Sequence, residues 1–273
     1  MYCKELDKTF ENKQEMFAQL KANKELLITS KKSEIKTKKN DFRIDVLSKK
    51  EANKALPNMQ DGYVYAVISN TNYIDSHCDV HLDGSMSKTA NEQQGKVFYV
   101  ADHKLEVSSI IATKKNIEMY LQTLSFKDLG KEYEGNTQCL IFKIPEDKIM
   151  LPAAKQLFAE KEQMENSIRM IYVNIDLAVN STDEDFKDEY KVWSEVYPKI
   201  ANKEKADEIG YFWAVRELRI VNEGSMVLFG SNDATPTDSK REAVNNTSKN
   251  EPFDNTQFDV STALQNVKFN LKV

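Results

Sequence analysis

The chain has 273 residues, 40% of them hydrophobic and 30% charged, and its formal net charge is −5. This length is sufficient for a substantial hydrophobic core, and the acidic balance gives no overall attraction to nucleic acid. The sequence has no apolar run of about 18 residues, so we expect no membrane span, and the opening "MYCKELDKTF" lacks the apolar segment of a secretory signal. Its three cysteines (Cys3, Cys78 and Cys139) match neither a zinc pattern nor a disulfide framework, which is typical of a reducing, intracellular compartment.

Residues 1–60 are expected to form an N-terminal arm made of a helix and a basic linker. Apolar residues recur at helical spacing over residues 5–28, which predicts an amphipathic helix. They are Leu6, Phe10, Phe17, Leu20 and Leu27. The stretch "TSKKSEIKTKKND" follows, and no aromatic residues interleave its lysines. It therefore favours an exposed connector over a nucleic-acid site.

Residues 61–231 are expected to form the core. Short segments rich in β-branched and aromatic residues predict strands: "YVYAVISN", "KVFYVA", "EVSSIIAT", "NIEMYLQTL", "TQCLIFKI", "SIRMIYVNIDLAV", "YFWAVRELRIV" and "SMVLFG". A helix is predicted over about residues 152–165, with Pro152 in its first turn, and a charged helical insertion over about 181–210. This order predicts an α+β protein, mainly an antiparallel β-barrel that is closed or nearly closed, with flanking helices.

Residues 232–273 are expected to form a flexible linker and C-terminal tail. The text from Ser231 to Gln257 is rich in Ser, Thr, Asn and Asp and is nearly free of large apolar residues. The last segment, "FDVSTALQNVKFNLKV", has a weak helical pattern.

Histidine is scarce, with three residues in the chain. His103 follows the run "KVFYVA", where strand alternation places it on the face of Tyr99 and Ala101. It can be a general base, or an ordinary hydrogen-bonded histidine at a strand end, and this stretch alone favours the ordinary role. His77 and His81 lie in a polar, turn-rich segment. Their spacing suits a metal pair only on a helix, so we expect both in exposed loops and no metal site.

Three further residues are candidates for chemistry. Ser167 begins a long predicted strand, and Arg169 follows two residues later on the same face, where it could bring a cation towards a developing oxyanion. Glu217 shares one face of "YFWAVRELRIV" with apolar residues, so it needs a partner. A histidine could supply that partner, and so could Arg219 through a plain ion pair.

The order of these motifs resembles the prohead (capsid maturation) serine proteases of tailed phages, the HK97-type family, which share a fold with the herpesvirus assembly proteases. The resemblance is carried by "VADHKLEVSSIIA", by "ENSIRMIYV" after a helix, and by "AVRELRIVNEGSMVLFGSN". The opening segment "VISNTNYIDSHCDVHLDGSM" adds Asp75, Asp79 and Gly84 at matching places. The family usually has Gly two residues after the Ser, where this chain has Arg169.

The resemblance implies that the chain is a serine endopeptidase without a cofactor, with His103 as general base, Ser167 as nucleophile and Glu217 as the orienting acid. It implies that the substrate is the capsid scaffold protein or the scaffold-like arm of the major capsid protein, together with the protease itself. The expected location is the host cytoplasm, inside the assembling prohead, and self-association is compatible with it. A non-catalytic capsid-assembly or scaffold module with the same fold stays open as an alternative, as does a metal-dependent hydrolase that uses His77 and His81.

Overall fold

The computed structural model describes residues 1–39, 59–160, 162 and 164–227, all within the first compact unit of the chain, Met1–Ala234. The predicted C-terminal tail (232–273) lies outside the described residues, as do the last two residues of the predicted basic linker "TSKKSEIKTKKND". The rest of this linker was expected to be an exposed connector, and that prediction is wrong, because it continues a helix up to Ser33 and forms a strand over Lys36–Lys39 that pairs within a sheet. The helices are α1 (Lys13–Ala22), α2 (Lys24–Ser33), α3 (Ser87–Glu92), α4 (Pro152–Glu160), α5 (Lys187–Val196) and α6 (Lys203–Ile209). The strands are β1 (Tyr2–Cys3), β2 (Lys8–Thr9), β3 (Lys36–Lys39), β4 (Tyr63–Asn70), β5 (Asp79–His81), β6 (Phe98–Ala101), β7 (Ile110–Ala112), β8 (Glu118–Ser125), β9 (Asn136–Pro145), β10 (Glu165–Val179) and β11 (Tyr211–Val227).

The N-terminal arm starts with a small hairpin, β1–β2, and continues with two helices where the sequence predicted one. The first helix begins at an N-cap, Asn12, whose side chain accepts a hydrogen bond from the Glu15 backbone N–H at 2.9 Å. Asn23 ends α1 and directly precedes α2. The predicted continuous helix is therefore wrong at this break, although the apolar face that includes Phe17 and Leu20 is buried as expected.

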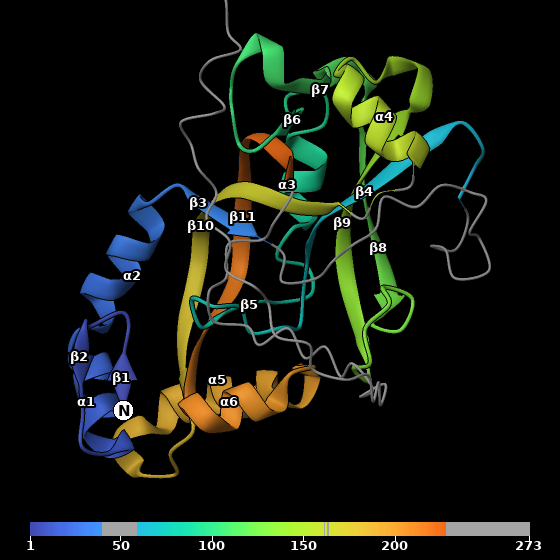
Figure 1. Cartoon of the computed structure of the whole chain (residues 1–273). Helices are drawn as coiled ribbons and strands as arrows, with labels where there is room; N and C mark the ends of the chain where they lie inside the picture. Colours follow the sequence, from blue (N-terminus) through green and yellow to red (C-terminus); the bar gives the residue numbers. More distant parts are fainter. Residues whose placement is uncertain (40–58, 161, 163, 228–273) are drawn as a thin grey trace, which may run out of the picture. The chain divides into compact units, whose positions relative to one another are not determined.

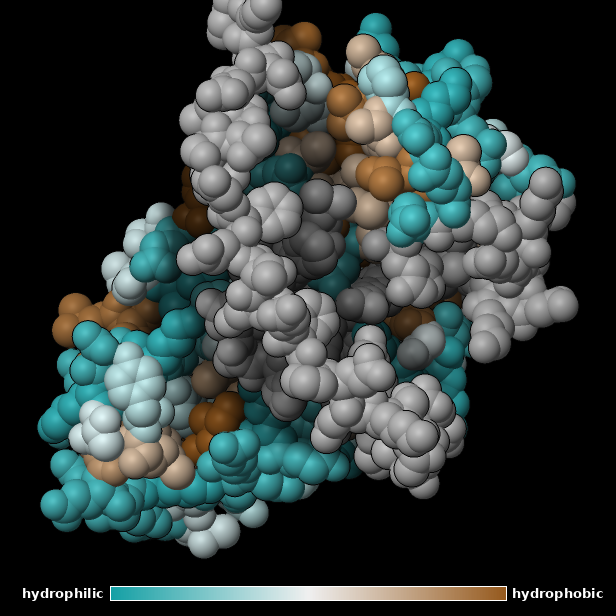
Figure 2. Space-filling model, viewed as in Figure 1, coloured by the Kyte–Doolittle hydropathy of each residue, from teal (hydrophilic) through white to brown (hydrophobic). Residues whose placement is uncertain are grey.

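The largest sheet has six strands, in the order β3-β10-β11-β6-β7, with β5 also paired to β11 (Figure 1). Its two longest strands, β10 and β11, form an antiparallel pair. The segment that connects them contains the predicted helical insertion, α5 and α6. The outer faces of these two helices are mainly hydrophilic (Figure 2), as the charged sequence of the insertion predicts. Strands β5 and β6 pair with β11 in parallel, so this sheet is mixed.

A second sheet has three antiparallel strands in the order β4-β9-β8. The structure is thus a mixed α/β protein. The strand pairings of the described residues form separate sheets and no closed barrel, so the predicted barrel is not confirmed. None of the described helices is long and apolar enough to cross a membrane.

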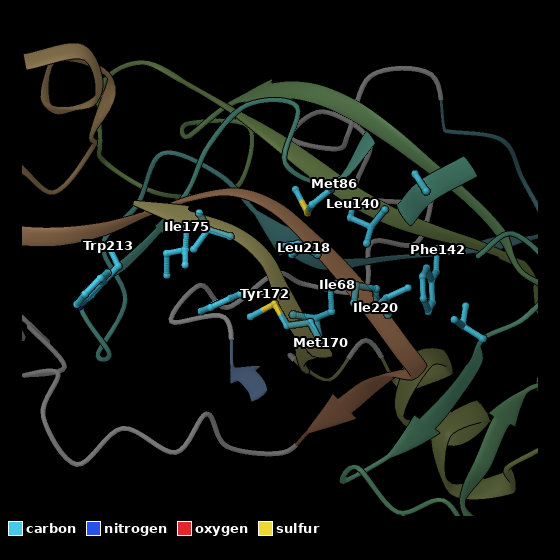
Figure 3. Close-up of a cluster of buried hydrophobic side chains, with 14 of the residues drawn as sticks. Ile68, Met86, Leu140, Phe142, Met170, Tyr172, Ile175, Trp213, Leu218 and Ile220 are labelled. Carbon is cyan, nitrogen blue, oxygen red and sulfur yellow. The ribbon is translucent and has the colours of Figure 1, made fainter. Parts of the chain in front are cut away.

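One hydrophobic core joins the two larger sheets (Figure 3). Ile68 and Phe142 come from the three-stranded sheet and pack with Met170 and Ile220 from the β10–β11 pair. The two sheets approach each other closely at Gly224 of β11, where an added Cβ would lie 2.8 Å from Phe142 Cε2 and 2.9 Å from Ile68 Cγ2. Strand β11 therefore has no room for a side chain at this position.

Candidate active site

His103 lies in the tight turn that follows β6. Asp102 and His103 both have left-handed backbone conformations, with φ of 52° and 57°. Such conformations cost non-glycine residues free energy, and the turn compensates with backbone hydrogen bonds on either side of His103. The Asp102 N–H donates to the Met226 carbonyl at 2.9 Å, and the Lys104 N–H donates to the Ala101 carbonyl at 3.0 Å. The turn fixes the histidine against the end of β11.

Ser167 lies near the start of β10 and is fully buried. Its partner across the β10–β11 ladder is Ser225, and on the other side of β10 it pairs with Lys39 of β3. Antiparallel neighbours bring the start of one strand beside the end of the other. The start of β10 therefore meets the last residues of β11 and, through β6, the turn that carries His103.

Three side chains meet there in one chain of hydrogen bonds. His103 Nε2 lies 2.7 Å from Ser167 Oγ, and His103 Nδ1 lies 2.7 Å from Glu223 Oε1. A carboxylate can only accept hydrogen bonds, so Nδ1 carries the ring proton and donates it to Glu223. Nε2 is then the acceptor for the Ser167 hydroxyl. This is the arrangement by which a general base activates a serine nucleophile.

Burial differs along this chain of groups. Glu223 has no exposed side-chain surface, whereas His103 keeps 14% of its side-chain surface exposed. The second oxygen of the carboxylate, Glu223 Oε2, has no hydrogen-bond partner among the described residues. The imidazole of His103 is thus the one ionisable group that is bonded to this buried carboxylate in the part of the chain that the structure describes.

The prediction that Glu217 orients His103 is wrong in its geometry. Glu217 pairs with Asn174 across the ladder, seven residues along β10 from Ser167, which corresponds to roughly 23 Å of strand. Its carboxylate instead binds Lys88 at 3.1 Å at the surface. The ion pair that the sequence also allowed for this carboxylate exists, but with Lys88 in place of Arg219.

Glu223 reaches the site because it lies near the end of β11, one residue before Gly224, which pairs with Ile168 beside the nucleophile. Strand β11 is irregular just before it, since Met170 pairs with Ile220 and three residues of β11 therefore face one residue of β10. Asn222, within this bulge, has a left-handed φ of 67°, and bulges are frequent beside active sites. The sequence analysis ended one predicted strand at Val221 and began the next at Ser225, so it left Glu223 in the connection and chose the glutamate inside the strand.

Arg169 lies on β10 opposite this bulge, two residues after the nucleophile, and it pairs with Thr37 of β3. The side chain is partly buried, and its Nε has no hydrogen-bond partner among the described residues. A guanidinium with an unused donor close to Ser167 in the strand is suited to an anion that forms beside the nucleophile.

The two remaining histidines do not form a pair. His77 is exposed, with Nδ1 3.4 Å from Lys4 Nζ. His81 was expected in an exposed loop, but it lies in β5, is fully buried and has Nδ1 3.3 Å from Ser69 Oγ. Across the described ranges, no group of three or more His, Cys, Asp or Glu side chains could hold a metal ion.

Comparison of the chain with protein-family models, with curated proteins and with solved structures finds no match.

Proposed function

We propose that this chain is a serine endopeptidase of the prohead maturation type, with Ser167 as nucleophile, His103 as general base and Glu223 as the orienting acid. The observation that carries the proposal is the unbroken chain of contacts of 2.7 Å from Ser167 Oγ through both ring nitrogens of His103 to Glu223 Oε1. These groups come from three segments that are distant in the sequence. Their convergence with the correct donors and acceptors supports acyl transfer over a structural role.

In the proposed mechanism, Ser167 Oγ attacks the carbonyl carbon of a peptide bond while His103 Nε2 takes the hydroxyl proton. The tetrahedral intermediate collapses when His103 returns this proton to the leaving amine, which yields an acyl-enzyme. Water then attacks the ester with the same histidine as base, and Ser167 is regenerated. Glu223 holds the ring in the required tautomer and stabilises the imidazolium that forms between the two proton transfers.

Arg169 is the proposed stabiliser of the oxyanion. The intermediate places a negative charge on the former carbonyl oxygen, beside the nucleophile. The Nε donor of Arg169, two residues from Ser167 and without a partner among the described residues, is available for that charge.

The substrate class follows from the resemblance. We propose that the enzyme cleaves the scaffold protein, or the scaffold-like arm of the major capsid protein, inside the assembling prohead in the host cytoplasm, and that it also cleaves itself. Self-cleavage was predicted for the segment from Ser231 to Gln257, which lies outside the described residues. The buried position of Ser167 and the pairing of β3 beside it fit an enzyme whose access to substrate is controlled. The proposal also includes the barrel of that family, with the sheets of β10–β11 and β4-β9-β8 as its two walls.

The test is reaction with a biotinylated fluorophosphonate, which forms a covalent bond with an activated serine. Wild-type protein is expected to be labelled at Ser167, as identified by peptide mass spectrometry, and Ser167→Ala is expected to lose the label. In co-expression with the candidate scaffold, the wild type should cleave the scaffold and Ser167→Ala should leave it intact, with a rate loss of about 10⁶-fold.

A matched control variant sharpens this test. Ser85→Ala removes a buried serine hydroxyl that has no hydrogen-bond partner among the described residues, and it should leave labelling unchanged. Complete scaffold processing by Ser167→Ala would refute the proposed nucleophile. An intact scaffold with an unlabelled wild-type protein would favour the non-catalytic assembly module.

A further inference from the structure

A fourth residue, Ser225, contacts the proposed triad through the backbone of His103. Its hydroxyl oxygen accepts a hydrogen bond from the His103 backbone N–H at 2.7 Å. The same hydroxyl donates its own proton to the Val100 carbonyl at 3.3 Å. Ser225 is fully buried, so water does not replace either bond.

The bond from His103 to Ser225 is the middle one of three successive bonds that hold the turn. The Asp102 and Lys104 amides on either side donate to backbone carbonyls, whereas the His103 amide depends on a side chain. Because Asp102 and His103 are both left-handed, the turn has an intrinsic tendency to relax. Removal of the hydroxyl leaves a buried N–H without a partner at the residue that carries the base.

Strand β11 therefore holds His103 at two points. Glu223 and Ser225 are two residues apart on one strand, so their side chains leave the same face. The carboxylate binds the ring at Nδ1, and the hydroxyl binds the backbone of the same residue. Ser225 is also the ladder partner of Ser167. One strand thus fixes the base relative to the nucleophile.

We infer that Ser225 is a positioning residue, whose hydroxyl sets the backbone of His103 so that the imidazole reaches Ser167 and Glu223 at the same time. The inference depends on the proposed function, because the reaction that benefits is the attack by Ser167. The hydroxyl touches no reacting atom, so its loss should slow the chemical step and leave substrate binding unchanged.

The experiment compares full-length wild type, Ser225→Ala and Ser85→Ala by their rates of reaction with the fluorophosphonate over a range of probe concentrations. For Ser225→Ala we expect the maximal inactivation rate to fall by about 10- to 100-fold, as for a displacement of about 1 Å in a catalytic group, with an unchanged half-saturating probe concentration. Ser85→Ala should match the wild type in both quantities.

Each outcome separates the inference from the proposed function. A folded Ser225→Ala protein, as judged by circular dichroism and a cooperative melting curve, that reacts within twofold of the wild type overturns the role of Ser225 alone. A loss that appears only in half-saturation also overturns it, because that result assigns the hydroxyl to binding. If the wild type itself does not react at Ser167, the proposed function fails first.

Discussion

Asp79 and Glu223 are two buried carboxylates at opposite ends of β11, the first on the neighbouring strand β5 and the second on β11 itself. The side chains that they contact differ in kind. Asp79 of β5, next to Trp213, binds the Lys31 ammonium at 2.6 Å and accepts a hydrogen bond from the Tyr172 hydroxyl at 2.8 Å. Both carboxylate oxygens of Asp79 therefore have a partner. Glu223, near the other end of the strand, has the imidazole of His103 on one oxygen and no hydrogen-bond partner on the other within the described segments.

On the proposed function, this difference separates a structural carboxylate, Asp79, from a catalytic one, Glu223. The charge of Asp79 is compensated permanently, because Lys31 reaches it from α2 and also lies 5.3 Å above the ring of Trp213. The charge of Glu223 is compensated by a cation only when His103 becomes protonated, which happens during each proton transfer of the proposed mechanism. In the proposed mechanism, the buried carboxylate of Glu223, which has no permanent cation among the described residues, stabilises the imidazolium of His103 that forms transiently.

Among the changes that test this comparison of Asp79 with Glu223, the largest effect is expected when the charge of Glu223 is removed. Glu223→Gln keeps the shape of the side chain but removes its charge and allows the amide to favour the wrong tautomer of His103. We expect the catalytic rate to fall by about 10⁴-fold, measured as scaffold cleavage or as fluorophosphonate labelling of Ser167.

The matched control for this change is Glu217→Gln, on the same strand. Glu217 binds Lys88 at the surface and lies far along the ladder from Ser167, so the rate should stay within twofold of the wild type. Equal losses in the two variants would contradict the assignment of Glu223 as the acid.

The second effect concerns stability at the other end of the strand. Asp79→Ala leaves the Lys31 ammonium buried with its nearest carboxylate removed, and the next one, on Glu5, lies 3.8 Å away. We expect the free energy of unfolding in urea to fall by about 3–5 kcal/mol, while the activity of each folded molecule is retained.

Asp176→Ala provides the comparison on the surface. Asp176 pairs with Arg216 where both side chains are about one-third exposed, at 38% and 31%. This variant should lose only about 0–1 kcal/mol, because water screens the pair. If Asp79→Ala and Asp176→Ala unfolded at the same urea concentration, the buried pair of Asp79 and Lys31 would not stabilise the fold more than the surface pair does.

The smallest expected effect is on thiol chemistry. Cys78 lies in the Asp79 region, where burial, and then the charges of Glu5 and Asp75, raise the pKa of its thiol to about 12. Burial raises the pKa of the Cys139 thiol to about 12 as well. A raised thiol pKa means that the reactive thiolate appears only as the pH rises towards 12, so about one molecule in 10⁴ carries it at pH 8.

We therefore expect iodoacetamide at pH 8 to leave both cysteines unmodified in the folded protein and scaffold cleavage unchanged, as followed by intact mass. Urea-unfolded protein is the positive control for alkylation. Inactivation in step with modification of either cysteine would challenge the serine as nucleophile.

Much of the element order could be predicted from the sequence, because β-branched segments and a charged helical insertion are local signals. The long strand β10 and the helices α5 and α6 lie where the sequence indicated, whereas β11 runs without a break through two predicted strands and α4 ends at Glu160, before the predicted end of the helix. The sheets were harder to predict, since strand pairing depends on contacts between distant residues. The parallel pairing of β11 with β5 and β6 has no signature in any one segment.

In the candidate site, too, local signals predicted some residues, and a contact between distant segments decided another. His103 and Ser167 stood out by scarcity and by position at a strand start, and the structure brings them together. Glu223 was missed because the sequence was divided into two strands, "YFWAVRELRIV" and "SMVLFG", with Glu223 between them, whereas the structure has one continuous strand there. A usable signal existed. If β10 and β11 are antiparallel neighbours, the start of one must face the end of the other, and "NEGS" near the end of β11 is therefore a better place for the acid than "RELR" in its middle.

The insertion that carries α5 and α6 joins β10 to β11 at the end of the ladder opposite to the site. Val179 pairs with Tyr211 there, twelve residues along β10 from Ser167, which is roughly 40 Å of strand. A change in the length of this connection therefore does not alter the distance between Ser167 and Glu223. For protein engineering, the exposed turn at residues 182–184 within this connection is a natural position for a fused domain or a reporter, because an addition there leaves the register at Ser167 and Ser225 intact.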